Sequence, residues 1–253
     1  MFNLHGKIAL ITGAGSGMGR ADALALASQG AKVILTGRHE GDCDAVAEEI
    51  DSLGGESYAY HMDVSKKDQI DQVFDEVISH FGRVDILVNN AGIFKPKPAM
   101  EITEEEWDET LSINLKGQFL CAQRAAQEMK KRKWGRIINI SSIASGGAGI
   151  GFSGAAHYTA SKGGILGMTE TLADEWAQYG ITVNAIAPGA IDTPMVDASH
   201  MSKEAMQAML AHIPLKRMGK PEEVSAAVAF LASEEASYIT GATLYIDGGW
   251  LAS

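Results

Sequence analysis

The 253-residue sequence predicts one α/β domain in which helices cover both faces of a doubly wound parallel sheet, a three-layer α/β/α arrangement. Short apolar runs alternate with longer helical patterns along the whole chain, and this alternation is typical of parallel strands joined by crossover helices. No Pro/Ser-rich linker, charge block or internal repeat divides the sequence. A hydrophobic content of 46% is sufficient for one sizeable core. We therefore expect residues 1–253 to form a single domain.

The elements follow one another in the order that such a sheet requires. Apolar runs rich in β-branched residues predict strands at Lys7–Thr12, Lys32–Leu35, Tyr58–Met62, Ile86–Asn89, Arg136–Ile140, Thr182–Ala187 and Thr243–Ile246. Amphipathic spacing predicts helices between them, near residues 18–29, 42–53, 67–81, 104–131, 158–179 and 221–232.

Two segments, 91–100 and 189–215, fit this rhythm poorly and contain four of the six prolines. Each begins directly after a predicted strand. In an open α/β sheet the ligand binds beyond the carboxyl ends of the strands. We therefore expect both segments to wall a ligand crevice, with 189–215 acting as a substrate lid.

The charge and the cysteines exclude several functional classes. With 21 basic and 32 acidic residues the net charge is −11, which disfavours nucleic acid and anionic membranes as partners. Cys43 and Cys121 stand alone without metal-ligand spacing, so we expect neither a metal nor a disulfide framework. Without a leader pattern or an apolar run of membrane-spanning length, a cytoplasmic location is expected.

A glycine-rich turn, Thr12–Gly19, separates the first strand from the first helix. Glycines let a backbone approach a pyrophosphate, which then lies at the positive N-terminus of the helix. An isolated turn of this composition has other uses, and the glycine spacing departs from the common G-x-G-x-x-G pattern. The strand before it and the helix after it favour a dinucleotide site, with contacts from Gly13, Ser16, Gly17, Met18 and Gly19.

Tyr158 and Lys162 are four residues apart on a predicted helix, so their side chains share a face. A phenol ordinarily has a pKa near 10, and a neighbouring ammonium lowers this pKa by favouring the phenolate. The pair is therefore a candidate for moving a proton on or off an alcohol oxygen. The same spacing also occurs in ordinary pairs on helix surfaces.

Several motifs occur in the order of a known family. They are Thr12-Gly13-x-x-x-Gly17-x-Gly19, Asn89-Asn90-Ala91-Gly92, Asn114, Ser142, Tyr158-x-x-x-Lys162, Pro188-Gly189 and Ile246-Asp247-Gly248-Gly249. Through this ordered set the whole chain resembles the short-chain dehydrogenase/reductase family in its single-domain form. The resemblance implies a Rossmann fold and an oxidoreductase that moves a hydride between a nicotinamide cofactor and a carbonyl or secondary alcohol.

The resemblance also implies a role for each catalytic residue. Tyr158 would exchange the proton, and Lys162 would lower the pKa of Tyr158 and bond the nicotinamide ribose. Ser142 would orient the reacting oxygen, and Asn114 would hold a water that links Lys162 to solvent, although a buried core amide is the other interpretation of Asn114. Further cofactor contacts are implied at Asp63, Val64, Asn90, Ala91, Gly92, Pro188, Gly189, Ile191 and Thr193, besides Tyr158 and Lys162 themselves.

The end of the second strand bears on the choice between NADP(H) and NAD(H). Gly37 occupies the position where the family carries the acid that selects NAD, and Arg38 can offer a charged fork to a 2′-phosphate. Ser16 is evidence against NADP(H), because many NADP-using relatives have a basic residue there. We predict NADP(H), with NAD(H) left open.

The sequence says less about the substrate than about the cofactor. Ser142 and Tyr158 stand 16 residues apart, which is longer than usual in the family, and the glycine-rich segment 143–154 between them should reshape the substrate mouth. An apolar lining is expected from Ile150, Phe152, Met195, Met201 and Met206.

Within the family, the sequence as a whole resembles reductases of 3-oxoacyl chains on acyl carrier protein. The basic run Lys130–Lys133 could dock such a carrier or simply end a helix. A small-molecule alcohol, sugar or hydroxysteroid substrate stays open. A non-catalytic nucleotide sensor would be expected to lose Tyr158, Lys162 or Ser142, and all are present. The resemblance also implies a homotetramer.

Overall fold

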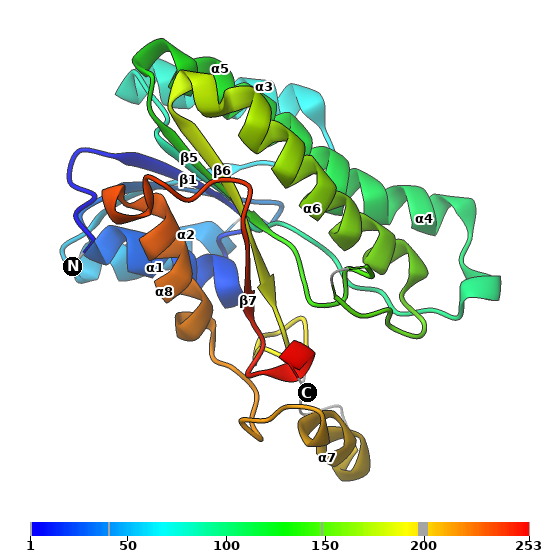
Figure 1. Ribbon diagram of the computed structural model, residues 1–253. Coiled ribbons are helices and arrows are strands. Elements are labelled where there is room, and N and C mark those ends of the chain that lie inside the picture. Colours follow the sequence, from blue (N-terminus) through cyan, green and yellow to red (C-terminus); the bar gives the residue numbers. More distant parts are fainter. Residues whose placement is uncertain (1, 40, 148, 197–201, 253) are drawn as a thin grey trace.

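The computed structural model describes residues 2–39, 41–147, 149–196 and 202–252. Seven parallel strands form one sheet in the order β3-β2-β1-β4-β5-β6-β7, which matches the predicted fold class (Figure 1). The strands are β1 (Ile8–Thr12), β2 (Lys32–Gly37), β3 (Glu56–His61), β4 (Ile86–Asn89), β5 (Gly135–Ile140), β6 (Ile181–Pro188) and β7 (Thr243–Ile246).

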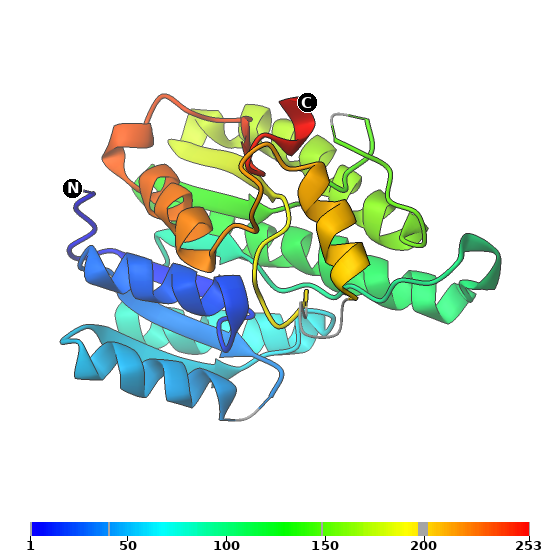
Figure 2. The same cartoon turned by 90° about the horizontal axis from the view of Figure 1, so that it is seen from below.

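Helices cover both faces of the sheet. They are α1 (Gly17–Ser28), α2 (Asp42–Ser52), α3 (Lys67–Phe81), α4 (Glu104–Leu111), α5 (Gly117–Arg132), α6 (Ala156–Trp176), α7 (Lys203–Ala211) and α8 (Pro221–Ala232). One face packs against the apolar sides of α1, α2 and α8, and the other against those of α3, α5 and α6 (Figures 1 and 2). Strands such as β1 and β4 are buried along their whole length, which is why their sequences are continuously apolar.

The register brings the carboxyl ends of the central strands together. Thr12 of β1 pairs with Thr36 of β2, and Ile11 pairs with Val88 of β4. The chain leaves β1 for β2 on one side, and later returns to β4 on the other side. Such a reversal of strand order opens a crevice at the carboxyl edge.

The long helix expected over 104–131 is interrupted. The helix α4 begins with a capping box between Thr103 and Glu106, and a π-helical turn, η2 (Ser112–Lys116), separates it from α5. The wider turn places Asn114 in the core, where it is fully buried. A π-turn inside a helix is frequently found at functional sites.

Segment 189–215 contains a helix that the sequence pattern did not predict. The helix α7 begins at Lys203, where the Ser202 side chain accepts a hydrogen bond from the Ala205 N–H, and it stands apart at the end of the molecule to which β7 runs (Figure 1). Within the described ranges, no helix combines the length and apolarity needed to cross a bilayer. Those ranges also contain no cluster of three or more His, Cys, Asp or Glu that could hold a metal.

Candidate functional site

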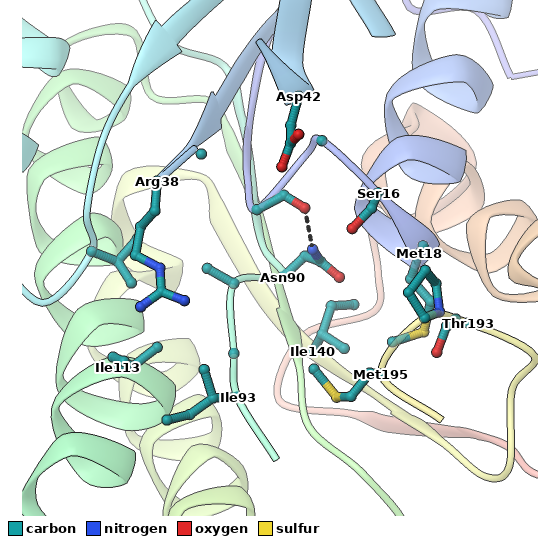
Figure 3. A pocket seen from close by; sticks show the side chains of 18 of the residues that line it. Ser16, Met18, Arg38, Asp42, Asn90, Ile93, Ile113, Ile140, Thr193 and Met195 are labelled. Atoms are coloured by element: carbon teal, nitrogen blue, oxygen red, sulfur yellow. Dashed lines mark hydrogen bonds between the residues drawn. The ribbon is translucent and has the colours of Figure 1, made fainter. Parts of the chain in front are cut away.

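A cleft opens at the carboxyl edge of the sheet, where the segments after the central strands meet the start of α6 (Figure 3). Side chains and backbone from distant parts of the sequence line it together. Twelve of the predicted site residues are in this lining, namely Gly13, Ser16, Gly17, Met18, Arg38, Val64, Asn90, Ala91, Gly92, Tyr158, Lys162 and Thr193.

The glycine turn is fixed by close contacts with the end of β4. The Asn90 side-chain amide donates to the carbonyls of Thr12 and Gly13, each at 3.0 Å, and Figure 3 draws one bond from this amide. The Thr12 hydroxyl accepts from the N–H groups of Asn90 and Ala91 at 3.1 and 3.0 Å. A Cβ on Gly19 would lie 2.2 Å from the Gly13 carbonyl oxygen, so only glycine fits there. The turn is therefore a rigid cradle.

The first turn of α1 opens directly onto this cradle. Ser16 is its N-cap but makes no side-chain capping hydrogen bond, so it does not satisfy the first N–H groups of the helix. A helix N-terminus of this kind favours a negatively charged group such as a pyrophosphate. The cradle and the uncapped helix together suit a dinucleotide, and this fit rests on the backbone that the glycines leave accessible.

The far end of the cleft lies at the end of β2. Arg38 and Asp42 both line it, and both side chains are seen there in Figure 3. A Cβ on Gly37 would come 3.0 Å from the Cys43 sulfur, a tight contact with a buried side chain. A side chain at position 37 would therefore crowd Cys43, and Arg38 lines this end of the cleft as a cation together with the Asp42 carboxylate.

Tyr158 lines the other end of the cleft, and Ser142 adjoins Tyr158 just outside the lining. Ser142 follows β5 and Tyr158 lies in the first turn of α6, so both sit at the carboxyl edge. Burial raises the pKa of Tyr158, and a side-chain hydrogen bond with Ser142 acts in the opposite direction. The Ser142 hydroxyl also accepts from the Ala144 N–H at 3.1 Å. The two hydroxyls are thus placed to share one oxygen of a bound substrate.

Lys162 lies deeper in the same cleft. Its ammonium donates to the Ile140 carbonyl at 2.9 Å and lies 5.6 Å from the centre of the Tyr158 ring. Burial lowers the pKa of Lys162 to about 8. The influence of Lys162 on the pKa of Tyr158 stays a prediction, since burial raises this pKa and the hydrogen bond with Ser142 acts against that rise.

Asn114 is held by three hydrogen bonds. Its oxygen accepts from the Ile93 N–H at 2.8 Å, and its amide nitrogen donates to the Ile93 carbonyl at 2.9 Å and to the Ser161 hydroxyl at 3.2 Å. A Cβ on Gly92 would be 3.3 Å from the Asn114 oxygen and 3.7 Å from the Lys162 nitrogen. The Asn114 oxygen and the Lys162 nitrogen therefore both approach Gly92 closely.

The remaining predicted residues lie outside the lining of the cleft. Gly19 supports the cradle from behind, while the Asp63 carboxylate accepts from the Ser65 N–H at 2.9 Å within its own loop. Ile191 is buried in the core, and a Cβ on Gly189 would press on Asp247 at 2.8 Å. Asn114, Ser142 and Pro188 complete this set, and Met201 falls outside the described residues.

Several lining residues were not predicted. Gly37 and His39 flank Arg38, Ile93 follows Gly92, and Ser141 precedes Ser142, so their positions in sequence were available as a signal. Met62 and Ile113 likewise precede the predicted residues Asp63 and Asn114, and Ile140 ends the predicted strand before Ser142. Asp42 reaches the cleft through tertiary packing, because it packs against Gly15 at the turn, and it gave no local signal.

Comparison with known proteins places this site in a family. A family model described as enoyl-(acyl carrier protein) reductase matches residues 13–251. A 3-oxoacyl-[acyl-carrier-protein] reductase from Staphylococcus epidermidis is 45% identical over 96% of this chain and 98% of its own length. The chain belongs to the short-chain dehydrogenase/reductase family.

Solved structures of the family superpose on the whole chain. A candidate gluconate dehydrogenase from Agrobacterium tumefaciens matches with a TM-score of 0.96 at 37% identity, covering 100% of this chain and 98% of that one. A candidate NAD(P)-dependent gluconate 5-dehydrogenase from Beutenbergia cavernae, with bound NADP at low occupancy, has a TM-score of 0.94 at 40% identity, covering 100% and 99%.

These comparisons confirm the predicted activity class and fold. This short-chain dehydrogenase/reductase is an oxidoreductase that acts on CH–OH or carbonyl groups of a small molecule with a nicotinamide cofactor. The basic run Lys130–Lys133 lies at the end of α5, just before β5 begins, and hence at the amino edge of the sheet. It is therefore at the opposite edge from Tyr158, which does not favour its use in delivering a carrier-bound substrate.

Proposed function

We propose that this short-chain dehydrogenase/reductase interconverts a small carbonyl compound and its secondary alcohol with NADP(H), and that Tyr158 is the general acid and base. The observation that carries the proposal is the convergence of Tyr158, buried Lys162 and the glycine cradle in one cleft, with the Ser142 hydroxyl hydrogen-bonded to Tyr158 at its border. When bound, the dinucleotide supplies or accepts the hydride.

The residues of the chain handle the proton and the position of the substrate. In reduction, the Tyr158 hydroxyl gives its proton to the substrate oxygen while Ser142 holds that oxygen, and in oxidation the direction is reversed. Lys162, charged below a pKa of about 8, supports the phenolate that Tyr158 becomes and would hold the nicotinamide ribose. Asn114, which like Lys162 approaches Gly92, would complete a path for the proton to solvent.

Replacement of Tyr158 by Phe tests the acid/base role. We expect Tyr158→Phe to lower kcat by about a hundredfold or more, because it removes the transferable proton, while binding of NADPH measured by fluorescence is retained. Tyr179→Phe is the matched control, since Tyr179 follows α6 at the other end of that helix. Near-normal turnover by Tyr158→Phe would disprove the role.

The choice of NADP(H) rests on Arg38 and on the contact between Gly37 and Cys43. We expect Arg38→Leu to lower kcat/KM for NADPH by about tenfold or more and to leave kcat/KM for NADH nearly unchanged, because only NADPH carries the 2′-phosphate. Arg132→Leu, at the amino edge of the sheet, is the control. A clear preference of the wild-type enzyme for NADH would contradict this part of the proposal.

A second candidate substrate is a 3-oxoacyl chain on acyl carrier protein, because the reductase from Staphylococcus epidermidis carries that name. Rates with a 3-oxoacyl thioester on the carrier and with free ketones distinguish the two.

We also propose a cytoplasmic homotetramer with segment 189–215 as the substrate lid. Light scattering that detects only monomer at micromolar concentration would refute the tetramer.

A further inference from the structure

Two aromatic rings, Phe94 and Phe152, extend in a row from the ring of Tyr158. The ring of Phe94 packs edge-to-face on Tyr158 with the centroids 4.9 Å apart and an interplanar angle of 69°. The ring of Phe152 contacts Phe94 in the same manner at 6.3 Å and 73°. We call Phe94 and Phe152 the aromatic wall. Phe94 comes from the segment after β4, and Phe152 comes from the glycine-rich segment between β5 and α6.

The backbone fixes the two halves of the aromatic wall against each other. The Lys97 N–H donates to the Gly154 carbonyl at 2.7 Å, which joins the two segments. The described part of 143–154 is folded on itself, since the Ile150 N–H donates to the Ile143 carbonyl at 2.8 Å. A Cβ on Gly149 would lie 2.1 Å from that same carbonyl oxygen. The glycines thus allow a compact loop that presents Phe152 in a defined place.

The aromatic wall is open to a ligand. Phe152 is 47% exposed and reaches Tyr158 through Phe94, so an exposed apolar ring extends outward from the catalytic residue. Met195, on the segment after β6, lines the cleft and is 45% exposed (Figure 3). A flexible thioether and rigid rings together offer an apolar surface that adapts to the shape of a hydrocarbon group.

The charged residues next to the aromatic wall are already paired. The Lys95 ammonium contacts both carboxylate oxygens of Glu109 at 2.8 and 2.7 Å. The Lys97 ammonium contacts both oxygens of Glu106 at 2.7 and 2.8 Å. These lysines therefore have partners within the protein, and a carboxylate or phosphate on the substrate would lose hydration against an apolar surface.

We propose that the aromatic wall selects uncharged substrates in which the reacting carbonyl belongs to a hydrocarbon ring, with Phe152 as a residue that determines specificity. This inference rests on the proposed function, since it assumes that Tyr158 protonates the substrate oxygen. The ring of the substrate packs against Phe94 and Phe152 while its oxygen meets Tyr158 and Ser142. A small acyclic ketone reaches the same hydroxyls without covering the aromatic wall.

The test compares three carbonyl probes, namely cyclohexanone, acetone and the anion pyruvate, with NADPH at saturation. We expect the wild-type enzyme to have the highest kcat/KM for cyclohexanone. Phe152→Ala should lower that value by about tenfold, because a lost apolar contact in a pocket changes discrimination by roughly this factor, and should change the value for acetone by less than about twofold. Phe152→Tyr should retain the preference, since the ring remains.

The controls separate the aromatic wall from folding and from the activity itself. Leu53→Ala removes an exposed apolar side chain at the end of α2, and should alter no rate. Equal losses for cyclohexanone and acetone in Phe152→Ala, or a wild-type preference for pyruvate, would overturn the role of the aromatic wall while leaving the proposed function intact. A wild-type enzyme that reduces acetone but not cyclohexanone would do the same. Failure to reduce any of the carbonyl probes would overturn both.

Discussion

The change Lys162→Met removes a positive charge that the fold buries beside the catalytic hydroxyl. Lys162 is only 4% exposed, and its ammonium has the Ile140 carbonyl as a hydrogen-bond acceptor. Methionine has a similar length and a neutral, apolar end. The Ile140 carbonyl keeps a second donor, the Gln118 side-chain amide at 3.2 Å. We therefore expect the variant to be more stable than the wild-type protein at neutral pH, although it should be catalytically impaired.

The size of the effect follows from the pKa of Lys162, which burial lowers from 10.5 to about 8. Each pKa unit corresponds to about 1.4 kcal/mol, so holding the buried ammonium charged costs about 3 kcal/mol below pH 8. Between pH 8 and 10.5 the unfolded chain keeps a proton that the folded chain has lost. The stability of the wild-type protein should therefore rise with pH across this interval, and its difference from Lys162→Met should shrink.

Urea denaturation of both proteins at pH 7 and pH 10 measures the free energies of unfolding. Lys116→Met is the matched control, because Lys116 is exposed and its replacement should change stability by at most about 0.5 kcal/mol. If Lys162→Met were no more stable than the wild-type protein at pH 7, or if the difference were the same at both pH values, the argument from burial would be wrong.

Three other changes test features of the fold. Burial raises the pKa of Asp22 well above its usual 3.8, and neither carboxylate oxygen has a hydrogen-bond partner in the described structure. The stability of the wild-type protein should therefore fall as pH rises from about 4. Asp22→Asn should be the more stable protein at pH 7 in urea denaturation, with a smaller difference at pH 4.5, and a constant difference would speak against a raised pKa. Gly19→Ala should weaken NADPH binding by about tenfold or more in a fluorescence titration, because its Cβ would displace Gly13, and unchanged affinity would show that the cradle is not rigid. Gly180→Ala should lower the Tm by several degrees in a thermal scan, since φ is +71° and the Cβ would lie 2.2 Å from the Lys133 carbonyl oxygen; an unchanged Tm would contradict this.

Much of the fold could be predicted from the sequence because buried parallel strands are apolar over their whole length. The predicted strands Ile86–Asn89 and Thr243–Ile246 have the bounds found in the structure. The π-turn at Ser112–Lys116 could not be predicted, because it accompanies the hydrogen bonds of Asn114 to the backbone of Ile93, which is distant in sequence. The helix α7 was missed because it is short and lies in segment 189–215, whose prolines fit the strand–helix rhythm poorly.

Some features of the candidate site could likewise be predicted from the sequence, and others could not. The glycine turn and the spacing of Tyr158 and Lys162 are local patterns, and the sequence indicates them directly. The burial that governs the pKa values of Tyr158 and Lys162 depends on the packing of several elements, and no short pattern contains it. Similarly, Asp42 approaches the glycine turn only because α1 and α2 begin at the same edge of the sheet.

The hydrogen bond between the Lys97 N–H and the Gly154 carbonyl has a practical consequence for enzyme engineering. It uses main-chain atoms alone, so the side chain at position 97 can be exchanged without losing it. Gly154 has a φ of +76° and should be kept as glycine. A library that varies the residues between Ser142 and Gly154 would therefore alter the loop within a preserved frame. Tyr158 and Lys162, anchored in α6, would keep their places while new substrates are explored.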